Sequence, residues 1–98
     1  MRTVYVSIGN SDDKLSQSKW ASFLTDVESL LEFECYEMHG AWFSAPDRVY
    51  QNACWCIVMT DEDIPWAQTR LRRLAATYRQ DSITWAEIEE VEFLEPEA

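Results

Sequence analysis

The stretch 53–59, Ala-Cys-Trp-Cys-Ile-Val-Met, restricts the possible folds of this chain more than any other feature. Seven consecutive apolar residues leave no polar side for water, so a strand formed here is buried on both faces. We therefore predict a strand at the centre of a sheet, with a neighbouring strand on each edge. Either orientation of this strand leaves apolar side chains on the side of the sheet that faces away from a covering helix.

Hydrophobic periodicity predicts the other elements. Residues 3–9 alternate, with Val4, Val6 and Ile8 on one face, which is typical of a strand with one apolar side. Apolar residues then recur every three or four positions beyond Ser16, which can cap a helix through its hydroxyl. The next predicted element is a strand over 34–44, in which Gly40 indicates a bulge or a close backbone approach. A helix follows the capping groups Thr60-Asp61-Glu62-Asp63 and has Pro65 in its first turn. The last element is a strand over 83–93 with a bulge or an early end at Glu89 and Glu90.

The order β-α-β-β-α-β predicts an α+β, ferredoxin-like fold: a four-stranded antiparallel sheet with two helices on one face. Right-handed crossovers place the first and third strands at the centre of that sheet. The 98 residues suit a single domain over 1–98, whose acidic C-terminal strand and tail occupy about 83–98.

The charge balance narrows the classes of function. Eight Lys and Arg against eighteen Asp and Glu give a net charge of −10, which is the wrong sign for binding nucleic acid or an anionic membrane. The chain contains no apolar run long enough to span a membrane and no basic-then-apolar start of a signal peptide. The acidity could attract a basic surface on a protein partner, although solubility alone is the more usual reason for such a charge. The basic residues cluster once, at Arg70, Arg72, Arg73 and Arg79, and six glutamates crowd the C-terminal end.

The three cysteines predict neither a disulfide framework nor a metal site. An odd count without a secretory start fits the reduced cytoplasm. Cys54 and Cys56 lie two positions apart, not three as in a zinc-binding pair. In the predicted strand pairing Cys54 falls opposite Trp42 and Cys35 lies far down the ladder, so these residues and His39 do not converge. We expect the cysteines to act as small hydrophobes, with no metal and no cofactor bound.

The uncovered face of the sheet is the first candidate binding surface. Tyr5 points out of it, and the tryptophans of the other strands add aromatic area. We therefore predict that this face is covered by a second copy in a homodimer, or that it forms a pocket closed by a partner. A pocket of this kind would bind a small molecule or support catalysis, with His39 as the acid or base. RNA-binding domains stack bases on such a face, but their glycine-rich aromatic motif is missing here. The candidate residues of the face or pocket are Tyr5, His39, Trp42, Asn52, Trp55 and Trp85.

Polar loop residues form the second candidate site. The adjacent Asp12 and Asp13 could hold Mg²⁺, but the Gly-Asn-Ser sequence before them is more typical of a capping turn, and no phosphate-binding glycine loop accompanies them. Three stretches, Ser7-Ile8-Gly9-Asn10-Ser11-Asp12-Asp13-Lys14-Leu15, Gln51-Asn52-Ala53-Cys54-Trp55-Cys56 and Gln80-Asp81-Ser82-Ile83, resemble small proteins of unassigned function in actinobacteria and their phages. The resemblance implies that Asn10, Asp12, Asp13, Asn52 and Asp81 do more than solvate the surface, and we expect the three stretches to meet at one end of the sheet.

The sequence therefore predicts a small, acidic, non-catalytic binding protein of the cytoplasm. A phage or mobile-element accessory protein that engages a host protein fits its size and charge. One alternative is an acidic mimic that blocks the nucleic-acid-binding surface of a basic protein. The other is a small-molecule-binding protein or small enzyme with a pocket of tryptophans on a ferredoxin-like dimer.

Overall fold

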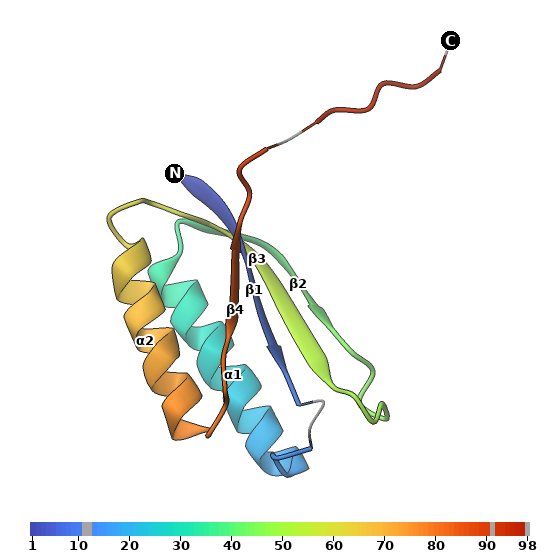
Figure 1. Cartoon of the computed structure of the whole chain (residues 1–98), viewed down its shortest axis with the longest axis vertical. Coiled ribbons are helices and arrows are strands. Elements are labelled where there is room, and N and C mark those ends of the chain that lie inside the picture. Colours follow the sequence, from blue (N-terminus) through green and yellow to red (C-terminus); the bar gives the residue numbers. More distant parts are fainter. Residues whose placement is uncertain (11–12, 91, 98) are drawn as a thin grey trace.

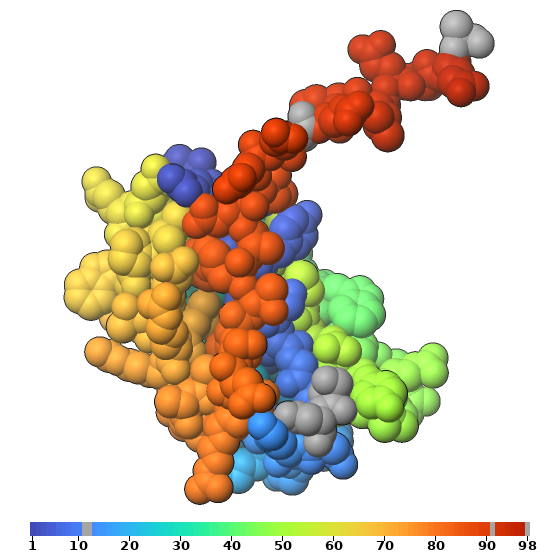
Figure 2. Space-filling view, viewed as in Figure 1, coloured from blue at the N-terminus to red at the C-terminus, as the bar shows by residue number. Residues whose placement is uncertain are grey.

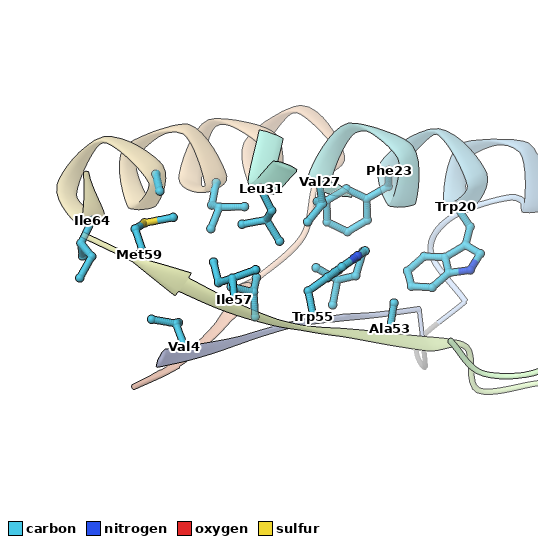
Figure 3. Packing of buried hydrophobic residues seen from close by; sticks show 14 of the residues in the cluster. Val4, Trp20, Phe23, Val27, Leu31, Ala53, Trp55, Ile57, Met59 and Ile64 are labelled. Carbon is cyan, nitrogen blue, oxygen red and sulfur yellow. The ribbon is translucent and has the colours of Figure 1, made fainter. Parts of the chain in front are cut away.

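The computed structural model describes residues 1–10, 13–90 and 92–97 of the chain. Its strands pair antiparallel in the order β2-β3-β1-β4, and both helices lie on one side of the sheet (Figures 1 and 3). The predicted α+β, ferredoxin-like architecture is confirmed, with the first and third strands at the centre. The elements are β1 (Arg2–Gly9), α1 (Gln17–Glu34), β2 (Glu37–Phe43), β3 (Asn52–Met59), α2 (Ile64–Thr77) and β4 (Thr84–Glu87).

The core lies between the helices and the sheet. Val4 of β1 pairs with Ile57 of β3, and Val6 pairs with Trp55, so all four side chains point toward the helices. Each of them is completely buried. Phe23 of α1 is buried against the same layer, as Figure 3 shows. Burial of these side chains supplies the main favourable term for folding.

The two helices begin as the sequence predicts, but α2 is capped differently. Ser16 caps α1, because its hydroxyl accepts a hydrogen bond from the Lys19 N–H (3.3 Å). At α2 the N-cap residue Asp63 makes no side-chain bond to the helix backbone. Its carboxylate instead accepts from the Thr60 hydroxyl (2.9 Å), so the polar turn before α2 is fixed by a side-chain pair. Pro65 stands in the first turn of α2 as expected, where its missing N–H costs nothing.

The predicted irregularity in β2 is present. The register between β2 and β3 shifts between Met38 and Gly40, which is the bulge expected at the glycine. Beyond the shift Trp42 pairs with Cys54, as the sequence also predicts. The bulge turns the later part of β2, so that Trp42 faces away from the helices.

The last strand ends early. β4 covers Thr84–Glu87, so of the two outcomes expected near Glu89 and Glu90, a bulge or an early end, the structure shows the early end. The Ile88 N–H still donates to the Thr3 carbonyl (3.0 Å), one residue beyond the end of β4. The described residues beyond β4, 88–90 and 92–97, form the C-terminal tail and run away from the body of the molecule (Figure 1). No helix among the described residues is long and apolar enough to cross a membrane.

Candidate functional site: the open face of the sheet

One face of the sheet has no helix over it, and we call it the open face. Tyr5 and Trp42 are its large aromatic side chains, with 41% and 60% of their surface exposed. Among the strand residues that the structure describes on this face, Glu37 is the one carboxylate, and no lysine or arginine occurs. A chain with a net charge of −10 therefore carries a nearly uncharged sheet surface. The open face consists of Thr3, Tyr5, Ser7, Glu37, His39, Trp42, Asn52, Cys54, Cys56, Val58, Thr84 and Ala86.

A tyrosine and a thiol interact at the centre of this face. Tyr5 pairs with Cys56 across the ladder, and hydrogen bonding to that thiol raises the pKa of Tyr5. Cys54 lies two residues away on the same face, and both thiols are partly exposed. Cys35 lies apart from them, and burial raises the pKa of its thiol. Within the described part of the chain no three His, Cys, Asp or Glu side chains are grouped to hold a metal ion.

His39 and Trp42 occupy different parts of the face. His39 lies at the bulge of β2, is half exposed, and has its Nδ1 4.0 Å from a carboxylate oxygen of Glu37. Trp42 lies farther along β2, where it lines a depression of about 440 Å³ at the β2–β3 hairpin together with Val49, Tyr50 and Asn52. The structure thus brings two of the predicted pocket residues, Trp42 and Asn52, into one hollow, and leaves His39 outside it.

Trp55 is not a surface residue, contrary to its place among the candidate binding residues. It faces the helices and is completely buried. Its indole Nε1–H donates to Glu28 Oε2 (3.1 Å), and the ring of Phe43 meets it edge-on at 5.8 Å. The pairing with Val6 fixes this orientation, because directly paired residues share a face of the sheet. Both faces of β3 are apolar, so the sequence of β3 alone could not choose between them.

Trp85 also lies on the helix side of the sheet rather than on the open face. It pairs with Val6 and packs partly buried against the core, with its Nε1–H donating to Glu87 Oε1 (3.2 Å). The predicted pocket of Trp42, Trp55, Trp85, His39 and Asn52 is therefore not assembled within one chain. Its members lie on both sides of the sheet.

The described residues of the three loop stretches meet at one end of the sheet, as the predicted strand order leads us to expect. Asn10 is buried, and its side chain bonds both the N–H and the carbonyl of Leu15 (3.1 and 3.0 Å). Asn10 therefore fixes the loop before α1 and offers little to a ligand. Asp81 pairs with Lys14 at 3.5 Å across the same end. Asp13 adopts a positive φ of 55° just after Asp12, which lies outside the described residues.

A polar depression of about 250 Å³ opens where the three stretches meet. Ser7, Asn52, Asp81 and Thr84 contribute polar side chains to it. Gly9 permits the close approach of Asn52, because a Cβ at Gly9 would lie 2.7 Å from Asn52 Oδ1. The depression is shallow and open to water, and no pair of its groups shows the geometry of a catalytic site.

Sequence reasoning missed a buried amide pair. Gln51 is almost completely buried, and its side chain exchanges two 3.0 Å hydrogen bonds with Gln17 at the start of α1. A third bond runs from Gln51 to the Pro46 carbonyl (3.2 Å) and holds the β2–β3 hairpin. No periodicity or motif in the sequence links Gln51 to Gln17, which lies 34 positions earlier. The contact is therefore seen only in the folded chain.

Comparison with known proteins supports the fold and assigns no function. No family model matches the chain, and none of the curated proteins matches it. Among solved structures, the solution structure of the C-terminal domain of the MgtC protein from Mycobacterium tuberculosis is similar, with a TM-score of 0.57. The match covers 94% of this chain and 93% of that one at 8% sequence identity, which shows a common fold alone. The resemblance to small proteins of actinobacteria and their phages stays a prediction.

Proposed function

We propose that this chain is a non-catalytic protein-binding domain that uses the open face to contact an apolar patch bordered by basic residues on a partner. The observation that carries the proposal is the contrast between that nearly uncharged face and the net charge of −10. Exposed aromatic groups on a face without charge are the usual anchors of a protein interface. Tyr5 and Trp42 are such anchors here.

Charge favours a basic partner over a second copy at this face. Two copies would bring two net charges of −10 together, and the described strand residues of the face include no lysine or arginine to offset them. A partner with lysines and arginines around its apolar patch gains from the same field, mainly in the rate of association. A homodimer through the sheet face is the competing arrangement, and the experiments below distinguish the two.

The biological setting is part of the same proposal. A cytoplasmic accessory protein of a phage or mobile element, engaging a host protein, fits a small acidic binding domain. In the sharpest form, the partner is a nucleic-acid-binding protein and this chain occupies its basic surface as an acidic mimic. That form requires affinity that falls steeply with added salt, because screening weakens interactions between exposed charges.

Affinity capture with paired tryptophan variants tests the proposal. Trp42→Glu places a charge on the open face, and Trp66→Glu makes the same change on α2, where the tryptophan is equally exposed at 63%. We expect basic proteins to be retained from a host lysate by the wild type and by Trp66→Glu, to be lost with Trp42→Glu, and to elute as salt rises. Retention that is the same for both variants would refute a role of the open face. Salt-insensitive retention would refute mimicry.

A small-molecule function is the second candidate, and the hollow at the hairpin favours it. Trp42 and Asn52 line that depression, whose volume of about 440 Å³ lies within the range of ligand pockets. Native mass spectrometry of the purified protein distinguishes the candidates. A bound small-molecule mass that disappears in Trp42→Glu would favour the ligand, and a bare chain would exclude a tightly held one. A bare dimer abolished by Trp42→Glu would instead reveal a sheet-face homodimer.

A further inference from the structure

A groove between α2 and β4 lies on the opposite side of the sheet from the open face. Its volume is about 410 Å³, and Leu71, Ala75, Ile83 and Trp85 give it an apolar floor. Arg72 stands on its wall, and no acidic side chain among the described residues forms an ion pair with it. Asp81 lines the end of the groove, where its carboxylate pairs with Lys14 at 3.5 Å. Figure 2 shows α2 and β4 side by side at this surface, with the tail projecting beyond them.

The C-terminal tail has the complementary chemistry. Phe93 and Leu94 are 86% and 84% exposed, the two most exposed large apolar side chains among the described residues. Glutamates at positions 89, 90, 92, 95 and 97 surround them. The tail thus carries an apolar pair flanked by negative charges, and the groove has an apolar floor with Arg72 of α2 beside it.

The outer edge of β4 is also free to pair with another strand. Because Ile88 bonds to Thr3, alternate residues of β4 direct their backbone groups toward β1. Trp85 and Glu87 therefore direct their N–H and C=O groups outward, beside the groove. An added strand at this edge would project every second side chain beneath α2.

We propose that the tail of one copy binds the α2–β4 groove of a second copy as an added strand, with Phe93 on the apolar floor. Glu95, two residues further, then faces the same side as Phe93 and lies toward the arginines of α2. The exchange is reciprocal, so it closes a symmetric dimer rather than an open chain of molecules. Local attraction between the tail and α2 offsets the repulsion between two acidic chains.

Binding between copies is favoured over folding back within one copy. To reach its own groove, the tail would have to reverse direction directly after Ile88. Residues 89–92, Glu-Glu-Val-Glu, include none of the Gly, Asn, Asp or Pro residues that form tight hairpin turns. Figure 1 shows the tail extending away from α2 of its own chain.

Sedimentation equilibrium of the full chain tests the proposal. We expect a dimer that Phe93→Ser weakens about tenfold to a hundredfold, the effect of losing one buried aromatic anchor. Arg72→Glu should weaken it as well, whereas Lys19→Glu makes the same charge change on exposed α1 and should leave it intact. A monomer at all concentrations, or equal effects of the two charge reversals, would overturn the proposal. Trp42→Glu should leave this dimer unchanged, so failure of the open-face proposal is seen separately.

A peptide titration provides the second measurement. A fluorescent peptide of residues 88–97 is titrated onto the full-length Phe93→Ser chain, whose own tail lacks the anchor. We expect saturable binding that weakens with salt and is lost when the peptide carries Phe93→Ser or the receptor carries Arg72→Glu. A peptide that fails to bind, or that binds both receptors equally, would show that the groove is not its site.

Discussion

Replacement of Trp55 by phenylalanine tests the orientation of the central strand β3. Trp55 is completely buried, donates to Glu28 and contacts Phe43, whereas Trp42 on neighbouring β2 is 60% exposed on the other face. The same substitution at the two positions therefore compares a core site with a surface site in one sheet. Phenylalanine keeps an aromatic ring, so the Trp55→Phe variant should still fold.

The structure sets the size of the two effects. Phenylalanine is smaller by roughly 40 Å³, and at about 24 cal/mol per Å³ the cavity costs about 1 kcal/mol, with about 1 kcal/mol more in transfer free energy. The lost hydrogen bond to the partly exposed Glu28 adds about 1 kcal/mol. The total of about 3 kcal/mol is a substantial part of the roughly 5–15 kcal/mol that stabilises a domain. Trp42→Phe should change the free energy of unfolding by less than about 0.5 kcal/mol.

Thermal and urea unfolding of the two variants provide the assay. A loss of about 3 kcal/mol lowers the Tm of a chain this short by about 12–24 °C. In urea the midpoint should fall while the slope stays constant, because the fold itself is unchanged. Equal, small effects at both positions would refute the buried orientation of Trp55. A large effect at Trp42 alone would mean that β3 is turned over.

Two further predictions concern single side-chain contacts. Asn10→Ala should cost about 2–3 kcal/mol in urea unfolding, because it leaves both buried backbone groups of Leu15 without partners; a loss below about 0.5 kcal/mol would contradict this structural role. Hydrogen bonds from Arg2 and Trp85 lower the pKa of Glu87 below its ordinary value of 4.5. The ionised carboxylate therefore stabilises the fold above pH 4.5, and this contribution is lost as the pH falls through the lowered pKa. The Tm of Glu87→Gln should accordingly lie below that of the wild type at pH 7 and approach it at pH 3, and a pH-independent difference would disprove the linkage.

The sequence predicts those elements in which one periodicity is unambiguous. Val4, Val6 and Ile8 alternate with polar residues, so the buried face of β1 follows directly from the sequence. The strand β3 has no polar residue to distinguish its faces, and its orientation depends on pairing with β1, a contact between residues some fifty positions apart. The misplaced Trp55 is therefore the expected kind of error, since local pattern sets the strand and non-local register sets its orientation.

The candidate site shows the same difference between residues placed by local pattern and residues placed by non-local pairing. Tyr5 follows from the alternation of β1, and Trp42 lies opposite Cys54 because that pairing follows from the hairpin. Trp85 could not be placed, because it depends on β4 pairing with the distant β1. The meeting of the loop stretches at one end of the sheet could be predicted from the strand order alone, since the loops after β1, before β3 and before β4 lie at that end.

The short β4 and the exposure of Phe93 and Leu94 are connected. β4 pairs with β1 as far as Glu87, opposite Val4, and one further bond runs from the Ile88 N–H to the Thr3 carbonyl. Phe93 and Leu94 lie beyond this pairing, and their side chains are exposed to water. A segment with strand-forming sequence and no intramolecular partner gains most from an edge on another molecule.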